Sequence, residues 1–336
     1  MWCLSILSLV IGLFLTIIFS TMVGSVTIPP LTAFRILFGV ASSPKSWPPV
    51  YSVIVLDVRL PRVLLGALVG SALSVAGTAM QALFRNPMAS PYILGVSSGA
   101  AFGASLAIVL GVNFIAGIYA VPLMAFLFAL FTVLIVYRIA KVPERTPVET
   151  LLLTGIAVGS LFSALVSFMM YIAGEKLNRI VFWLMGGLWT SDWNRVFVTS
   201  PLVLLGTIVM YLFNRHLNLI LMGEETALHL GLEVEVFKKI ILVFASLITA
   251  AAVSVCGIIG FVGLIIPHVM RIIVGPDHRV LLPSSCLAGA IFLVCVDTLA
   301  RTIIEPTELP VGIITALVGV PFFLYLLRNR KRVTGW

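Results

Sequence analysis

The sequence predicts an all-α fold: a polytopic transmembrane helical bundle of about ten spans, with both termini in the cytoplasm. Hydrophobic residues make up 60% of the 336-residue chain and charged residues only 10%, whereas a soluble domain carries about 25% charged residues. Eight stretches, each long enough for at least one membrane helix, contain no Asp, Glu, Lys or Arg. These stretches must be helical, because backbone amides in lipid need partners within their own segment and the alternation typical of a β-barrel is missing.

Two of the uncharged stretches are long enough for more than one helix. Residues 86–137 are expected to fold back at the Gly-Val-Asn break at 111–113. Residues 240–270 leave a remainder after one helix, and 257–273 hold three glycines and a proline, which predicts a short or broken span. The eight stretches therefore predict ten helices.

The distribution of basic residues predicts the orientation. With ten spans and the C-terminal tail placed inside, 13 Lys and Arg residues fall on the inner side and 8 on the outer side, and such an excess marks cytoplasmic loops. The net charge of +8 is then expected to face the anionic inner leaflet of the lipid bilayer, so no nucleic-acid partner is predicted. The first apolar stretch lacks a basic leader segment and a clear cleavage site, so we expect it to remain as a helix.

We expect a single transmembrane domain over 1–336. Residues 26–58 contain five prolines and are expected to form an outer cap or loop. Residues 175–195, rich in Trp and Arg, predict an interfacial helix along the outer surface. Residues 215–239 form the most polar inner loop, in which Glu224 and Gly231 are expected to begin and cap a helix of about two turns.

Five blocks of sequence, in order along residues 55–328, resemble the FecCD-type iron-siderophore and cobalamin permease family of binding-protein-dependent ATP-driven importers. The blocks are RLPR at 59–62 with Gly66 and 77–81, NP at 86–87 with 91–100, GEETA through LG at 223–231, 257–268 with Arg271, and ELPVG at 308–312 with Gly319 and Pro321.

The resemblance implies a permease subunit of ten helices that pairs with a second copy of itself. It also implies two copies of a separate ABC ATPase subunit below the membrane and an extracytoplasmic solute-binding protein above it, in the cell membrane. The expected cargo is a metal chelate such as an iron siderophore, haem or cobalamin, or a similar ligand such as molybdate. No cofactor or resident metal ion is expected.

The resemblance assigns binding-protein docking to Arg59, Arg62 and Arg301. We expect the first two at the outer end of the second span and Arg301 at the outer end of the ninth. A guanidinium group suits docking because it can form two parallel hydrogen bonds with a carboxylate and stays positively charged. The alternative is that these are helix-end residues whose charged heads reach the interface, and Asp297 could pair with Arg301 internally.

The resemblance also assigns coupling to the ATPase to the inner loop. The residues concerned are Gly223, Glu224, Glu225, Thr226, Ala227, Leu230 and Gly231. The chain has no G-x-x-x-x-G-K-[ST] phosphate loop, so ATP must be bound by another polypeptide and the chain itself is not expected to be an enzyme. The alternative is an amphipathic helix that rests on the inner leaflet.

Two other functions are weighed against transport powered by a partner ATPase. Residues 95–99 match G-x-S-x-G, which with Ser97 as nucleophile and His268 as base would suggest an intramembrane serine hydrolase. An ion-coupled secondary transporter would carry ionisable residues in mid-membrane. Here Asp297 and Glu149 fall near span ends, which favours the ATP-driven importer.

Overall fold

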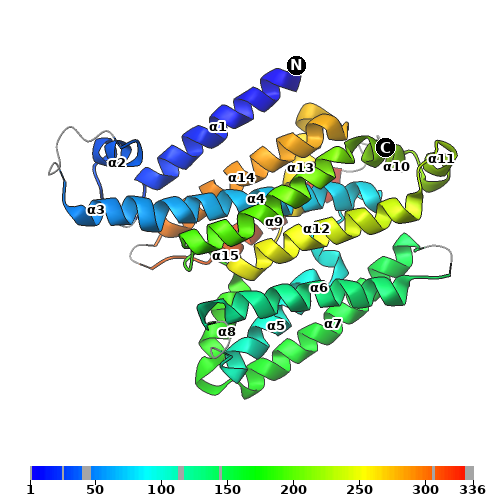
Figure 1. Ribbon diagram of the computed structural model, residues 1–336, viewed down its shortest axis with the longest axis horizontal. Helices are drawn as coiled ribbons and strands as arrows, with labels where there is room; N and C mark the ends of the chain where they lie inside the picture. Colours follow the sequence, from blue (N-terminus) through cyan, green and yellow to red (C-terminus); the bar gives the residue numbers. More distant parts are fainter. Residues whose placement is uncertain are drawn as a thin grey trace.

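The computed structural model describes residues 2–24, 26–39, 47–112, 117–143, 146–304 and 307–329. Throughout these ranges the regular structure is helical and no strand occurs. The helices pack into one bundle whose long helices run roughly along the longest axis of the molecule (Figure 1). The predicted all-α class is confirmed.

Seven helices of the described chain are long and apolar enough to cross a membrane, and three shorter apolar helices accompany them. One of the long helices is continuous from Pro49 to Leu83 and consists of α3 (Pro49–Val53), η1 (Ile54–Arg59) and α4 (Leu60–Leu83). The other six are α1 (Trp2–Met22), α6 (Ala120–Ala140), α7 (Val148–Ile172), α9 (Trp193–Leu212), α12 (Val234–Cys256) and α14 (His278–Thr302). The shorter ones are α5 (Val96–Leu110), α13 (Val262–Val274) and α15 (Val311–Asn329). Together they agree with the ten predicted helices.

The breaks between helices lie where glycines predict them. Gly111, in the left-handed region at φ 67°, caps the end of α5 before the chain turns back towards α6. Gly257, at φ 71°, ends α12, and a non-helical stretch separates it from the short helix α13. The predicted reversal at 111–113 and the predicted short span are both confirmed, although residues 113–116 lie outside the described part.

The remaining helical segments are short and lie at the ends of the bundle or between spans. They are α2 (Pro30–Leu37), η2 (Pro91–Leu94), η3 (Gly117–Tyr119), η4 (Gly174–Lys176), α8 (Leu177–Met185), α10 (Asn214–Leu221) and α11 (Glu224–His229). Helix α8 matches the interfacial helix predicted within 175–195.

Helix α4 lies at the centre of the bundle, where its main neighbours are α14, α12, α13 and α9. Small residues permit this close packing: a Cβ added at Gly70 would overlap the Gly289 carbonyl, and one added at Gly77 would overlap the Gly263 carbonyl. Close backbone approach through glycine is typical of membrane helix pairs. Helices α5, α6 and α7 form a second group beside this centre (Figure 1).

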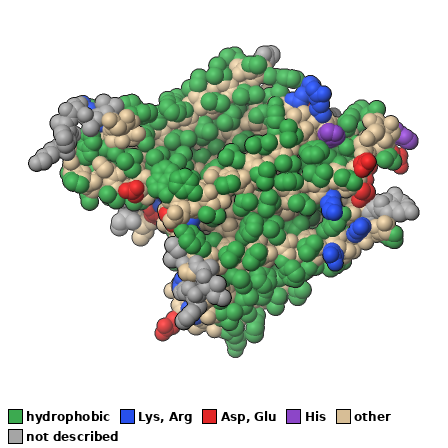
Figure 2. Space-filling view, in the orientation of Figure 1, with side chains coloured by type: hydrophobic (Ala, Val, Ile, Leu, Met, Phe, Trp, Pro, Cys, Tyr) green, Lys and Arg blue, Asp and Glu red, His purple; other side chains and the backbone are tan. Residues whose placement is uncertain are grey.

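The two ends of the bundle differ in character. One end carries α2, α3 and α8, and the other carries α10 and α11 (Figure 1). The start of α1 lies at the second end, since the Arg279 guanidinium carbon is 5.7 Å from the centre of the Trp2 ring. Figure 2 shows charged side chains gathered at that end and a mainly hydrophobic face between the ends. Helix α1 begins on the side of 215–239 and α15 runs towards that side, as the charge count predicts (Figure 1). Lys45, Arg145 and the tail 330–336 lie outside the described residues.

The second span begins earlier than its uncharged stretch indicates. That stretch starts at residue 63, but the helix is continuous from Pro49 to Leu83. A helix of 35 residues is longer than the roughly 30 Å hydrocarbon layer, so Arg59 and Arg62 lie inside the helix but still towards its outer end, where both guanidinium groups find partners within the protein. Within the described part of the outer segment 26–58, residues 30–37 form α2 and residues 49–58 form α3 and most of η1.

Candidate functional sites at the two ends of the bundle

The outer end holds an arginine cluster formed by Arg59, Arg62, Asp297, Arg301 and Glu308. Arg62 lies on α4, Asp297 and Arg301 lie one turn apart on α14, and Glu308 lies just before α15. The Arg62 guanidinium contacts both carboxylates, with Nη2 2.9 Å from Asp297 Oδ1 and Nη1 2.8 Å from Glu308 Oε2. Arg301 Nε lies 3.1 Å from Asp297 Oδ2. Asp297, whose side chain is 2% exposed, therefore has two cationic partners.

Arg59 and Arg301 also cap the end of helix α1. Arg59 Nη1 donates to the carbonyl oxygen of Met22 at 3.1 Å, and Arg301 Nη2 donates to that of Ser20 at 3.2 Å. The last carbonyls of a helix have no partner within it and carry a partial negative charge. Two guanidinium groups placed there satisfy these acceptors and stabilise the join between α1, α4 and α14.

The structure therefore brings the three predicted docking arginines together and buries each of them. The predicted internal pair between Asp297 and Arg301 is confirmed. Sequence reasoning missed Glu308 as a partner, although it is the first residue of the ELPVG block. Their guanidinium groups are engaged inside the subunit here, and docking to another protein stays a prediction.

The opposite end presents the polar inner loop as helices α10 and α11. Glu224 and Glu225 occupy the first turn of α11, where a negative charge is favourable, and Gly231 follows its end at φ 89°. This agrees with the predicted helix. Ala227 is buried against the bundle, whereas three large apolar side chains face outward: Met222, Leu228 and Leu230.

A buried lysine joins α11 to the bundle. Lys238, near the start of α12, has a side chain that is only 2% exposed. Its Nζ lies 2.6 Å from Glu224 Oε2 and 3.1 Å from Glu235 Oε1, and it donates to the Thr146 carbonyl at 3.3 Å. Glu235 in turn accepts the Thr146 backbone N–H at 2.9 Å. These contacts, which we call the Lys238 clamp, tie α11, α12 and the segment before α7 into one unit.

Helix α10 is fixed to α14 by a second polar group at the same end. Asn218 Nδ2 donates to Asp277 Oδ1 at 2.8 Å, and the His278 backbone N–H donates to Asn218 Oδ1 at 2.9 Å. Asp277 caps α14 and accepts hydrogen bonds from the Arg279 side chain. These hydrogen bonds lower the pKa of the Asp277 carboxyl well below its usual value, so the cap stays charged at physiological pH.

The serine-hydrolase alternative finds no support in the local structure. Ser97 lies in the first turn of α5, after Gly95 in the left-handed region. The segment before it is the 3-10 turn η2, whereas a nucleophile elbow needs a strand leading into the helix. Ser97 therefore belongs to a helix start in a helical bundle.

Comparison with known proteins gives a consistent identification. The model of the FecCD transport family matches residues 12–329. The chain is 50% identical over 84% of its length to the cobalamin import system permease protein BtuC of Halobacterium salinarum, covering 76% of that protein. It is 40% identical to the hemin transport system permease protein HmuU of Yersinia pestis, over 97% of this chain and 98% of that one.

A solved structure of similar fold is a metal-chelate type ABC transporter in an inward-facing conformation. It superposes with a TM-score of 0.84 at 34% identity, over 96% of this chain and 98% of that one. Permeases of this family are not enzymes; they work in the inner membrane with a separate ATPase and a substrate-binding protein. The chain therefore belongs to the FecCD transport family and is the multi-pass permease subunit of an ATP-driven importer.

Proposed function

We propose that this permease imports cobalamin. The observation that carries the proposal is the 50% identity to the cobalamin import permease of Halobacterium salinarum; a hemin permease is 40% identical and a vitamin B12 permease of Salmonella paratyphi A 38%. Both ligands are large metal-bearing macrocycles. In the proposed system the binding protein would select the ligand, and the permease would provide the route through the membrane.

We further propose that the route lies between two copies of the chain, each a single permease domain over 1–336. An apolar groove of about 670 Å³ between α8, the segment that joins α12 to α13, and α15 supports this arrangement. Its lining includes Met185, Phe261 and Val320, and Leu317 beside them is strongly exposed. A second copy packed against this groove would cover these apolar side chains.

At the inner end, one ATPase subunit per permease would bind α10 and α11, giving two ATPases in the dimer. The outward-facing Met222, Leu228 and Leu230 offer an apolar contact, rimmed by the charged first turn of α11. The proposed coupling residues are those at 223–227 and 230–231. Movement of this segment would reach α12 and the start of α7 through the Lys238 clamp.

At the outer end, the solute-binding protein would dock above the arginine cluster. The cluster brings three guanidinium groups against two carboxylates, which leaves one positive charge without a carboxylate partner inside it. Arg59 is the residue concerned, since its described hydrogen bonds go to backbone carbonyls. This charge supports Arg59, Arg62 and Arg301 as a docking group for carboxylates of the binding protein.

The cargo is tested by uptake into proteoliposomes that contain the permease with its ATPase and its binding protein. Radiolabelled cyanocobalamin and hemin are offered separately, each with ATP present on the side of the ATPase. We expect uptake of cobalamin, and competition by unlabelled cobalamin but not by hemin. Uptake of hemin in preference to cobalamin would contradict the proposed cargo.

A further inference from the structure

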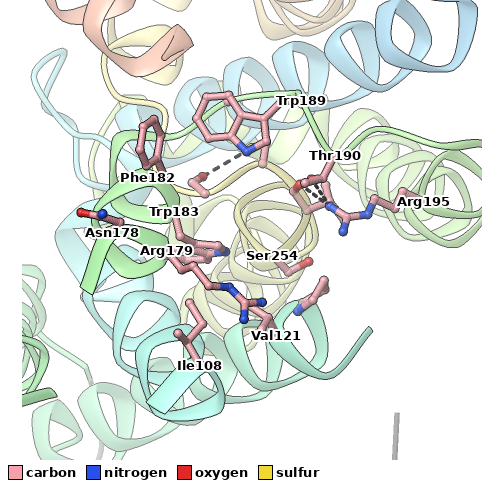
Figure 3. Close-up of a pocket in the computed structure, with 15 residues that line it drawn as sticks. Ile108, Val121, Asn178, Arg179, Phe182, Trp183, Trp189, Thr190, Arg195 and Ser254 are labelled. Carbon is pink, nitrogen blue, oxygen red and sulfur yellow. Dashed lines mark hydrogen bonds between the residues drawn. The ribbon is translucent and has the colours of Figure 1, made fainter. Parts of the chain in front are cut away.

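A cavity of about 350 Å³ opens at the outer end, between α8, the start of α9 and the end of α12. Its polar lining comes from Asn178, Arg179, Thr190, Arg195 and Ser254. Figure 3 shows the guanidinium groups of Arg179 and Arg195 entering from different helices, with Ser254 between them in this view and two tryptophans nearby. The cavity belongs neither to the arginine cluster nor to the inner coupling segment.

The positive charge in this cavity is only partly balanced by the described part of the protein. Arg195 donates to Thr190 Oγ1 and to the Val255 carbonyl oxygen, but its Nε is buried without a hydrogen-bond partner. Arg179 forms no hydrogen bond or ion pair with a described residue. Asp192 accepts the Arg195 backbone N–H at 2.7 Å; it attracts the Arg195 guanidinium electrostatically but forms no ion pair with it. The described lining of the cavity holds two arginines and no carboxylate, so the cavity carries a net positive charge.

A second cavity of about 380 Å³ continues from the first one. The two share Arg195, and the second is lined mainly by apolar side chains of α6, α9 and α12, among them Leu123, Phe126 and Leu202. Phe126 lies six residues into α6, which places it about 9 Å from the outer end of that helix. The groove thus runs from the outer boundary into the hydrocarbon layer, on a face that is mainly hydrophobic in Figure 2.

We propose that these two cavities together bind one anionic phospholipid of the outer leaflet. The phosphodiester lies between Arg179 and Arg195, because guanidinium groups form bidentate hydrogen bonds with phosphate oxygens. One acyl chain lies in the groove between α6, α9 and α12. The net positive charge of the cavity favours a headgroup with net negative charge over a zwitterionic headgroup, in which an ammonium group offsets the phosphate. A free anion or a carboxylate of the binding protein would engage the arginines and leave the adjoining groove empty.

The test measures binding of phosphatidylglycerol to the delipidated full chain in detergent by native mass spectrometry. The headgroup arm uses the double variant Arg179→Gln with Arg195→Gln, and its control is Arg35→Gln, a change of the same kind on α2 outside both cavities. The acyl-chain arm uses Leu123→Trp, which fills the groove. Its control is Leu127→Trp, one turn further along α6; Leu127 is 49% exposed against 48% for Leu123 and does not line the groove.

We expect one bound phosphatidylglycerol per chain, weakened at least tenfold by the double arginine variant and by Leu123→Trp, and unchanged in both controls. Glycerol phosphate should not compete, and phosphatidylcholine should bind more weakly. Equal lipid binding in all variants would overturn the proposal. The proposal would also be overturned if glycerol phosphate competed with phosphatidylglycerol and Leu123→Trp bound phosphatidylglycerol normally. Those two results together would indicate a site for small anions. Lipid binding that persists while the arginine variant loses the binding protein would assign the arginines to docking instead.

Discussion

At the scale of single residues, Asp297 is the centre of the outer end. It is buried, and it contacts both Arg62 on α4 and Arg301 on the next turn of its own helix. A carboxylate in such a position is stable because two guanidinium groups replace its lost hydration. Glu308 contacts Arg62 as well, but its side chain is 31% exposed and keeps part of its water.

Replacement of Asp297 should therefore be far more costly than replacement of Glu308. Asp297→Asn leaves Arg62 and Arg301 as buried cations without their shared partner, and loss of one member of a buried ion pair costs roughly 3–5 kcal/mol. Glu308→Gln removes a half-exposed partner, and we expect a loss under about 1 kcal/mol. Thermal unfolding of the two variants in the same detergent measures the difference. Equal unfolding midpoints would show that the cluster does not depend on Asp297.

Arg59 allows docking to be separated from stability. Arg59→Gln keeps side-chain N–H donors for the carbonyl oxygens at the end of α1 but removes the positive charge. We expect weaker association with the binding protein at low salt, a smaller difference at high salt because ions screen the attraction, and little change in thermal unfolding. Surface plasmon resonance at two salt concentrations measures this. Unchanged association with a stable variant would remove Arg59 from the docking group.

At the scale of elements, the short helix α11 depends on the clamp beneath it. The Lys238 ammonium group forms ion pairs with Glu224 of α11 and Glu235 of α12. Hydrogen bonds of Lys238 and Glu235 with the Thr146 backbone connect this group to the segment before α7. If the ATPase acts on α11 as proposed, these contacts would transmit its movement to α12 and to the segment before α7.

Loss of the clamp should uncouple transport from ATP hydrolysis. Lys238→Met fills the same space without charge, and Glu224 and Glu235, with side chains 40% and 36% exposed, can turn to water. We expect the ATPase complex to assemble and hydrolyse ATP, with several-fold less cargo moved per ATP. Lys239→Met, at the exposed neighbouring lysine, is the matched control and should behave as wild type. Normal uptake per ATP in Lys238→Met would contradict the role of the clamp.

At the scale of the whole molecule, hydropathy and glycine breaks predicted the ten helices well, because the thickness of the bilayer fixes the length of an apolar span. The limits of the second span were harder to predict, since uncharged stretches end at Arg62 whereas the helix begins at Pro49. The missing information was the pairing of Arg62 with Asp297 and Glu308, 235 and 246 residues away in sequence. The same holds for Lys238 and Thr146. Order along the chain does not specify which distant side chains meet.

As the permease subunit of an ATP-driven importer, this chain couples ATP hydrolysis by a partner to movement of a ligand across the membrane. The most direct measurement is ligand uptake by proteoliposomes that contain the permease and its ATPase, with binding protein and ligand outside and nucleotide supplied to the ATPase. We predict uptake that requires hydrolysable ATP and the binding protein, and that a proton or sodium gradient cannot replace. Uptake driven by such a gradient without ATP would contradict the account.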